Sequence, residues 1–408
     1  MARQGRAAFA FIFITVALDM LALGVMIPVL PKLIVQLEGG DVSAAARMTG
    51  LFGMAWAAAQ LFAAPVLGAL SDRFGRRPII LLSNLGLGLD YVLMALAPSV
   101  SWLFVGRVLS GITTASFPTA GAYIADVTPE DERAAKFGAL SAAFGLGFVV
   151  GPAVGGVLGA IDLRLPFWVA AGLSILNFAY GLVILPESLP AERRTPFRWA
   201  LANPLGSLAF LRSHPGLFAL GVASALGFLA HEALPSVFVL YATERYAWDE
   251  AAIGVALAAV GICSTVVSAG LTGYAVRRLG ERSALLFGLL CGVLGLLVFA
   301  LAPTGAWFLS GIPLIALWGL GGPALSAMMS RAVGPSAQGQ LQGALGSLHG
   351  ITGTVAPVLF TQVLAATFLP GSLLPAGAPF FVATLFLAAS LVLTWRVVGA
   401  LSAHRAAA

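Results

Sequence analysis

The sequence predicts an all-α integral membrane protein with twelve transmembrane helices, arranged as two parallel six-helix repeats. Three observations predict this fold: a composition suited to lipid, a dozen long apolar segments, and an internal repeat. Of the 408 residues, 59% are hydrophobic and only 10% are charged, whereas soluble domains are about one quarter charged. Most of the surface is therefore expected to face the lipid bilayer.

The apolar segments are each about 20 residues long, which is enough to cross roughly 30 Å of hydrocarbon as an α-helix. They are continuously apolar rather than alternating, which excludes a β-barrel. The first segment follows Arg3 and Arg6, as in a signal peptide, but its length, Asp19 and Pro28 predict a retained helix. The expected spans are residues 7–30, 49–70, 78–97, 101–125, 137–160, 165–185, 216–241, 251–275, 283–302, 306–330, 341–367 and 377–398.

Lys and Arg residues gather on one predicted side of the membrane. The sequence has 22 of them, and the predicted outside loops hold only Lys32, Arg47, Arg164 and Arg245, with Arg107 inside a span. Because cytoplasmic loops carry the excess of basic residues, both termini are predicted to be cytoplasmic. The same excess accounts for the net charge of +5 without a nucleic-acid partner.

An internal repeat appears when the sequence is shifted by 205 residues. The shift places Gly68, Arg73, Gly75, Arg77 and Pro152 on Gly273, Arg278, Gly280, Arg282 and Pro357. Six helices per repeat return the chain to the same side, so the repeats are parallel. We expect halves at residues 1–185 and 216–408, joined by a cytoplasmic linker at 186–215 in which residues 197–211 form a helix on the membrane surface.

A short charged segment, Gly68 to Pro78, follows the second span and reads GALSDRFGRRP. Glycine permits a tight backbone there, and the acid Asp72 can favour a helix N-terminus or pair with arginine. From charge alone, the segment is equally consistent with a simple anchor on the cytoplasmic side.

This segment resembles the conserved cytoplasmic loop of the major facilitator superfamily. Further segments make the whole chain similar to tetracycline efflux proteins of the drug/proton antiporter group. They are Leu18–Asp19, Pro28–Pro31, Asp90–Tyr91, Gly106–Thr113 and Ile124–Asp126. The resemblance implies the major facilitator fold, a monomer in the bacterial inner membrane, and a substrate held near the midplane. It also implies no cofactor, because the proton gradient drives transport.

The resemblance implies that the charged loop is a cytoplasmic gate that joins the two halves. The gate residues are Gly68, Asp72, Arg73, Gly75, Arg76 and Arg77, with Asp126 as the partner of Arg73. In the second copy of the loop, Arg277 stands where the acid is expected.

The fifth span carries small residues at four-residue spacing, which lets helices approach closely. They are Gly147, Gly151, Pro152, Gly155 and Gly156. Helix packing alone explains such a face. In the resembled family it is the antiporter motif, which indicates export rather than import.

Six ionisable residues fall inside predicted spans, where charges are costly and usually functional. They are Asp19, Asp90, Arg107, His231, Glu232 and His349. A carboxyl in an apolar cavity has a raised proton affinity and a nearby arginine lowers it, so such a pair can load and release a proton. Asp19 is the expected first proton carrier and Glu232 the second, with His231 sharing its proton. Bracing of two helices by Arg107, and packing by His349, remain alternatives.

The predicted function is proton-coupled efflux of an apolar or amphiphilic small molecule, with a tetracycline-like drug as the leading candidate. The candidate cavity residues are Gln60, Phe117, Phe144, Trp318, Met328 and His349. Gly292 and Ser264 occupy positions where the resembled proteins carry an essential acid and a histidine. An exporter or flippase of a lipid-like amphiphile or metabolite, with altered proton coupling, is therefore the alternative.

Other classes have less support. Few amide side chains line the central spans, which argues against an importer of a sugar, and a receptor or scaffold leaves the motifs unexplained. The two cysteines, Cys263 and Cys291, lie inside spans and are expected to be packing residues. There is no phosphate-binding loop, metal-ligand spacing or nucleophile constellation, so the sequence does not predict an enzyme.

Overall fold

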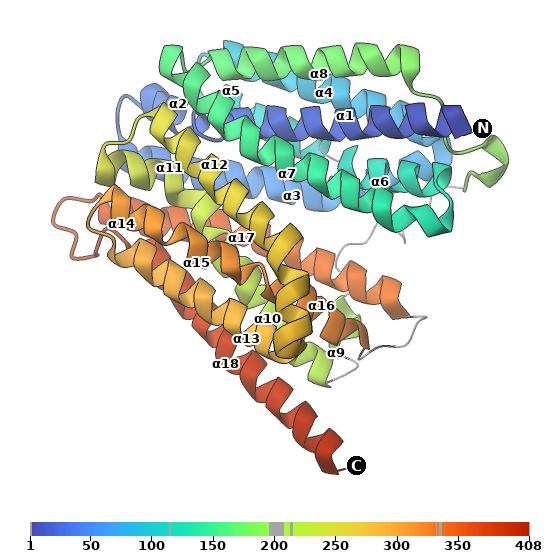
Figure 1. Cartoon of the computed structure of the whole chain (residues 1–408). Coiled ribbons are helices and arrows are strands. Elements are labelled where there is room, and N and C mark those ends of the chain that lie inside the picture. The colour runs from blue at the N-terminus through green and yellow to red at the C-terminus, as the bar shows by residue number, and fades with distance from the viewer. Residues whose placement is uncertain are drawn as a thin grey trace. The chain divides into compact units, whose positions relative to one another are not determined.

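The computed structural model describes residues 2–113, 116–195, 208–212, 215–331, 333 and 337–407, and these residues form helices joined by short loops (Figure 1). The helices of the N-terminal part are α1 (Ala2–Met26), α2 (Leu30–Leu37), α3 (Val42–Phe74), α4 (Arg76–Leu96), α5 (Val100–Thr113), α6 (Ser116–Val127), α7 (Glu130–Ile161) and α8 (Leu165–Ile184). Those that follow are α9 (Leu208–Arg212), α10 (Pro215–His231), α11 (Ala233–Tyr246), α12 (Glu250–Val266), α13 (Thr272–Leu301), α14 (Gly305–Ser310), α15 (Ile312–Trp318), α16 (Gly321–Arg331), α17 (Gln338–Thr367) and α18 (Ala378–Ala407).

Nine stretches of the described residues are long and apolar enough to cross a membrane, and shorter apolar helices lie at Val100–Thr113, Gly145–Ile161 and Glu250–Val266. Together they cover the twelve predicted spans, so the fold class is confirmed. Several spans consist of two helices in series. Proline stands in the first turn of α2 and α15, where its missing N–H costs no helical hydrogen bond.

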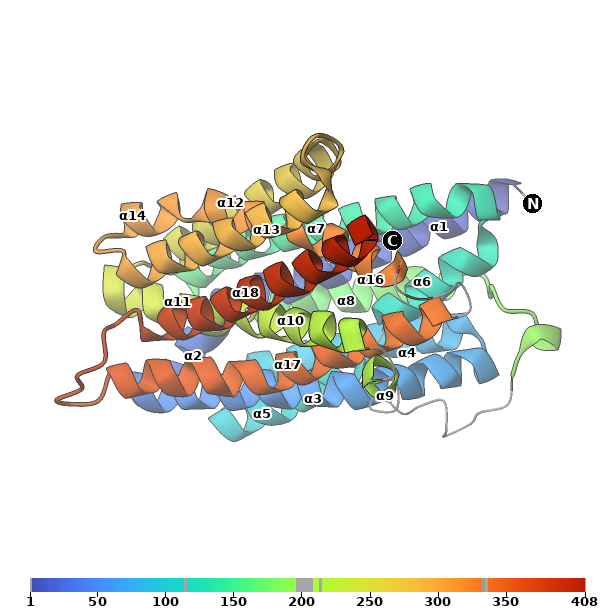
Figure 2. The ribbon, with the colours of Figure 1, turned by 90° about the horizontal axis from the view of Figure 1, so that it is seen from below.

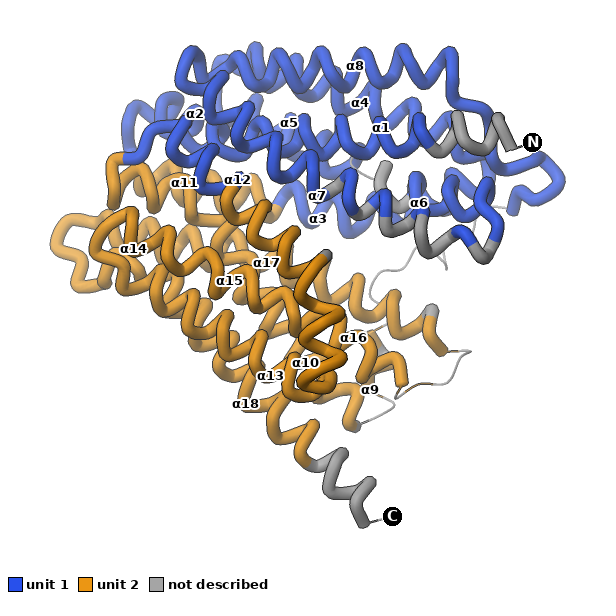
Figure 3. The backbone as a smooth tube through the Cα atoms, in the orientation of Figure 1, with its two compact units in different colours: residues 1–41, 55–203, 248–258 blue, residues 42–54, 204–247, 259–408 orange. Residues whose placement is uncertain are grey.

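The chain forms two compact units (Figure 3). Unit 1 comprises residues 1–41, 55–203 and 248–258, and unit 2 comprises residues 42–54, 204–247 and 259–408. The first residues of α3 thus belong to unit 2, and the first residues of α12 belong to unit 1. The predicted halves at residues 1–185 and 216–408 were defined by the internal repeat in the sequence. Their bounds differ from those of the two compact units, and the division into halves stays a prediction.

Each unit has its own apolar core. In unit 1, α1 packs against α4, α6 and α7 through Phe11, Ile12, Val16, Met20, Ile80, Ala120, Tyr123, Ile124, Leu140, Ala143 and Leu185. In unit 2, one core cluster consists of Leu211, Leu217, Leu220, Met329, Leu341 and Ala344. Helices α10, α13 and α18 of that unit run side by side (Figure 2).

Both described ends of the linker make specific contacts, each with one of the two units. Most of the surface helix predicted at residues 197–211 lies outside the described residues, and α9 covers its last part. Leu211 of α9 is 4% exposed and packs in the core of unit 2. At the other end, the backbone N–H of Thr195 donates to the carbonyl of Asp72 at 3.1 Å.

The repeat is visible in the backbone. Gly75, between α3 and α4, has φ 104° and ψ 161°, and Gly280, 205 residues later, has φ 77° and ψ 158° within α13. Side chains are excluded from this region by their Cβ atoms, so glycine is required at both turns. The predicted break near residue 280 is therefore a sharp turn that separates two helical segments of α13.

Candidate functional site

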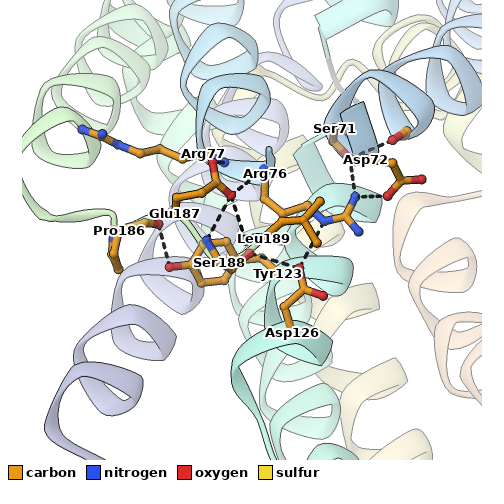
Figure 4. Close-up of polar contacts among 11 residues, drawn as sticks. Ser71, Asp72, Arg76, Arg77, Tyr123, Asp126, Pro186, Glu187, Ser188 and Leu189 are labelled. Carbon is orange, nitrogen blue, oxygen red and sulfur yellow. Dashed lines mark hydrogen bonds and ion pairs between the residues drawn. The ribbon is translucent and has the colours of Figure 1, made fainter. Parts of the chain in front are cut away.

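The charged loop of unit 1 is built around Arg76, the first residue of α4 (Figure 4). Its guanidinium donates to Asp72 and, at 2.6 Å, to the hydroxyl of Ser71. Its Nε lies 3.2 Å from Oδ2 of Asp126, at the end of α6. Our prediction that Asp126 pairs with Arg73 is therefore wrong. The turn at Gly75 directs Arg76 towards α6, while Arg73 lies over the ring of Phe74 at 5.0 Å.

Glu187 is a functional candidate that sequence reasoning missed. Its Oε1 accepts from the backbone N–H of Arg76 at 2.8 Å and its Oε2 from that of Arg77 at 3.3 Å (Figure 4). An anion at this place satisfies N–H groups of the first helical turn and complements the helix dipole. A Cβ atom on Gly75 would lie 2.2 Å from Oε2 of Glu187, so glycine also makes room for the carboxylate. The only signal in the sequence was an acid directly after the sixth span.

Three further contacts connect the loop and α6 to the end of α8 and the residues that follow it. The hydroxyl of Ser188 donates to Oδ2 of Asp126 at 3.1 Å, and that of Tyr123 donates to the carbonyl of Pro186 at 3.0 Å. Arg77 donates to the carbonyl of Leu182 at 2.8 Å. The motif thus joins α3, α4, α6 and α8 within unit 1.

Unit 2 carries a charge-reversed copy of the central ion pair. Shifted by 205 residues, Arg76 and Asp126 correspond to Glu281 and Arg331. These two residues form an ion pair in which Arg331 binds both carboxylate oxygens of Glu281. In this second copy of the loop, Arg277 stands where the resemblance led us to expect the acid. The structure instead keeps the pair at the neighbouring positions with the signs exchanged.

The predicted proton-coupling residues of unit 1 are buried together. Asp19 of α1 is 4% exposed, Asp90 of α4 is 1% exposed and Arg107 of α5 is 6% exposed. The hydroxyl group of Tyr91, itself 1% exposed, is close enough to all three to interact with them electrostatically. The structure therefore brings the two acids and the arginine of the prediction into one cluster.

Arg107 contacts a thioether and an aromatic ring in the described part of unit 1. Its Nη1 lies 3.5 Å from the sulfur of Met26 on α1, and its guanidinium is 5.4 Å from the ring centroid of Trp56. A Cβ atom on Gly106 would lie 2.8 Å from Oδ1 of Asp90, so α4 and α5 approach closely at this cluster. Such contacts hold the charge in place without neutralising it permanently.

The glycines of α7 form a close backbone contact with α1. Cβ atoms on Gly147, Gly151 and Gly155 would lie 2.6 Å from the Cβ of Met20, 2.7 Å from the Cα of Gly24 and 2.0 Å from the carbonyl oxygen of Val25. Pro152 lies inside α7 with its Cδ beside Gly24.

Gly156 faces another helix of unit 1. Its Cβ would lie 2.3 Å from the carbonyl oxygen of Glu250, at the start of α12. Lys32 of α2, which the sequence reasoning placed only in an outside loop, forms a 3.0 Å ion pair with Glu250.

In unit 2, His231 and Glu232 lie at the break between α10 and α11. The ring of His231 meets that of Trp318 edge to face at 5.6 Å, and the ring of His349 meets that of Phe228 at 5.0 Å. Glu232 interacts electrostatically with His349. The structure therefore gathers Glu232, both histidines and Trp318 of the prediction.

The missing acid of the ninth span has a steric explanation. A Cβ atom on Gly292 would lie 2.8 Å from the ring of Trp318 and 2.7 Å from Leu387. Trp318 thus covers the position at which the resemblance led us to expect an acidic side chain. Cys291 next to it is buried, and both cysteines are free.

The remaining cavity candidates are only partly placed. Gln60 and Met328 are half-buried, in unit 1 and unit 2 respectively. The side chains of Phe117 and Phe144 lie outside what the structure describes. Ser264, at the position where the resemblance led us to expect a histidine, is half-buried on α12.

Buried charges inside long apolar helices, linked to a charged loop at their ends, define a multi-pass membrane transporter. The sequence model of the Major Facilitator Superfamily matches residues 12–357. The chain belongs to this family.

Among its relatives, the class C tetracycline resistance protein of Escherichia coli is 40% identical over 86% of this chain and 88% of its own length. The class G protein of Vibrio anguillarum is 36% identical over 89% and 91%. Two solved structures show the same fold at low identity. The human organic anion transporter MFSD10 (TETRAN) has a TM-score of 0.70 at 23% identity, covering 96% of this chain and 99% of its own. The nucleoside transporter NupG has a TM-score of 0.77 at 13% identity, covering 96% and 98%.

Proposed function

We propose that this transporter exports a tetracycline-like drug from the cytoplasm in exchange for protons, across a bacterial inner membrane. The observation that carries the proposal is the buried cluster of Asp19, Asp90 and Arg107 in a chain 40% identical to a tetracycline resistance protein. Buried acids of this kind bind and release protons as their surroundings change. No cofactor is needed, because the proton gradient supplies the free energy.

In the proposed cycle, Asp19 accepts a proton from the outside and releases it to the cytoplasm. Protonation of Asp19 removes one negative charge from the cluster that contains Asp90 and Arg107, which changes the electrostatic field there. The α1–α7 contact at Gly151 and Gly155 transmits a shift of α1, because two backbones in direct contact have no flexible side chains between them to absorb it. Asp90 shares the field of Arg107 and modulates the proton affinity of the cluster.

In this proposal, side chains of unit 2 bind the drug. Trp318, Phe228 and the histidines His231 and His349 offer ring faces and hydrogen-bonding nitrogens, and Glu232 supplies one negative charge. Flat aromatic rings can pack against the fused rings of a polycyclic substrate, and the histidines can bond to its polar groups. Glu232 acts as the second proton carrier, in place of the acid that Trp318 excludes at Gly292.

The test is drug accumulation in energised inverted membrane vesicles that contain the full chain. We expect tetracycline uptake that a proton uncoupler abolishes and that Asp19→Asn removes. Asp41→Asn, the same change at an exposed loop position, is the matched control and keeps full uptake. Uptake that survives both the uncoupler and Asp19→Asn contradicts the coupling role. A folded wild type that never accumulates tetracycline contradicts the drug assignment and directs the search to lipid-like amphiphiles.

A further inference from the structure

A second set of buried polar side chains lies beside the charged cluster of unit 1, where α1, α4 and α8 meet. Thr15, Asn84, Ser174 and Asn177 are all between 0% and 1% exposed. Thr15 donates its hydroxyl hydrogen to Oδ1 of Asn177 at 3.1 Å. Polar groups in the hydrocarbon region are costly unless hydrogen-bonded.

The helix register brings Asn84 to the level of Asn177. A Cβ atom on Gly88 of α4 would lie 3.5 Å from the Cβ of Ser174, and one on Gly181 of α8 would lie 2.7 Å from Leu81. Asn84 is three residues after Leu81 and four before Gly88, so it shares their face of α4. The two helices run antiparallel, and Asn84 therefore faces α8 between Ser174 and Gly181.

Most of the hydrogen-bonding capacity of this set is unused by the described residues. Neither the amide nitrogen nor the amide oxygen of Asn84 has a partner among them, and the same holds for the hydroxyl of Ser174 and the amide nitrogen of Asn177. Together these groups offer both donors and acceptors. A buried water typically makes about three hydrogen bonds, and this set provides them.

The set connects to the proposed proton carrier along α1. Asp19 follows Thr15 by four residues and Met26 follows it by eleven, which places all three on one face of the helix. Met26 contacts Arg107, and Thr15 contacts Asn177. One face of α1 thus touches the charged cluster at one end and the polar set at the other. Beyond the polar set, Phe11 and Leu81 close the interface against Gly181.

We propose that Thr15, Asn84, Ser174 and Asn177 hold internal water molecules that form the first part of the proton route between Asp19 and the end of unit 1 that carries the charged loop. The side chains keep their own protonation state and orient the water. A proton that leaves the Asp19 carboxyl joins the adjacent water while another O–H proton moves to the next oxygen. The proposal rests on proton coupling as proposed above.

The transport test uses purified full-length chain in proteoliposomes and the variant Asn84→Leu, which keeps the branched shape of the side chain but removes its polar groups. We expect uptake driven by a pH gradient to fall about tenfold or more, because ordered proton transfer is lost. Tetracycline counterflow exchanges drug for drug and needs no net proton transfer, so it is expected to stay within about twofold of wild type. Asn84→Ser restores gradient-driven uptake. Ser83→Ala, at a buried polar position three residues before Gly86, which meets Thr113 of α5, leaves both unchanged.

Two results overturn the inference. One is gradient-driven uptake by Asn84→Leu equal to wild type. The other is an equal loss of uptake and counterflow with a lowered melting temperature that Asn84→Ser does not repair, which is the pattern of a purely structural residue. If wild type shows neither uptake nor counterflow, the proposed function fails instead.

The water molecules can also be observed directly, whatever the transport assays show. A cryo-EM map that resolves ordered water is expected to show water density within hydrogen-bond distance of Asn84 and Ser174. A dry interface, with Asn84 bonded directly to α8, contradicts the proposal.

Discussion

The charge-reversed ion pairs of the two repeats predict that the Arg76–Asp126 pair tolerates reversal. In unit 1 the single variants Arg76→Glu and Asp126→Arg each place like charges together, whereas the double variant restores an opposite pair. The second repeat already carries that arrangement, as Glu281 and Arg331. We therefore expect the double variant to be more stable than the two single changes predict.

The size of the effect follows from distance and burial. At 3.2 Å and an effective dielectric constant of about 20, Coulomb's law gives roughly 5 kcal/mol of attraction. Desolvation offsets most of this, since the side chains of Arg76 and Asp126 are only 11% and 23% exposed. Exposed pairs couple by about 0.2–1 kcal/mol and charged hydrogen bonds contribute about 1.5–3 kcal/mol, so we expect a coupling of about 1–2 kcal/mol.

The assay is a double-mutant cycle on the free energy of unfolding, measured by denaturant titration in mixed micelles. The Asp72 and Ser71 contacts of Arg76 are lost both in the single Arg76→Glu variant and in the double variant. Their contribution therefore cancels in the cycle. The same cycle at Glu281 and Arg331 is the control. Arg331 is 53% exposed, so the coupling there is expected below about 1 kcal/mol. A double variant in unit 1 that is as unstable as the sum of the two single changes, which is a coupling free energy of zero, refutes the reasoning.

Two other predictions concern close packing. Gly155→Ala forces a methyl group against Val25 and is expected to destabilise the chain by about 1–3 kcal/mol. Gly172→Ala, with no atom within 4 Å of the added methyl, is the matched control, and equal melting temperatures for the two variants contradict the prediction. Gly292→Asp is expected to lower the melting temperature and drug uptake because Trp318 fills the site. Because a Cβ at position 292 also meets Leu387, adding Trp318→Ala should recover only part of the lost melting temperature. A fully stable Gly292→Asp single variant argues against the steric explanation.

The sequence was sufficient for those features that depend on local pattern. Segment length and polarity predicted the spans, and the 205-residue shift predicted turns at Gly75 and Gly280. Small-residue spacing predicted a close helix contact at Gly151 and Gly155. Each of these properties is set by residues near one another in the chain, so no knowledge of the packing was needed.

Features that depend on distant contacts were not predictable. The partner of Asp126 is Arg76 rather than Arg73 because the backbone turns between them, and the direction of that turn is a matter of tertiary structure. Glu187 caps a helix whose first residue is 111 positions away. Asn84 was not among the predicted site residues, because its place beside α8 depends on the register of two helices that are distant in the chain.

The two repeats also show which constraints outlast duplication in a single chain. Gly75 and Gly280 are identical because no other residue adopts their backbone angles without strain, so the position admits no substitute. The ion pairs have exchanged signs because the attraction depends only on the product of the two charges. Reversal through single changes nevertheless passes through a like-charged intermediate. The expected coupling of about 1–2 kcal/mol is small enough for a folded chain with several kcal/mol of net stability to survive that step. The reversed pair in unit 2 is therefore consistent with the modest coupling that the cycle measures, and a much larger measured value makes this route between the two arrangements difficult.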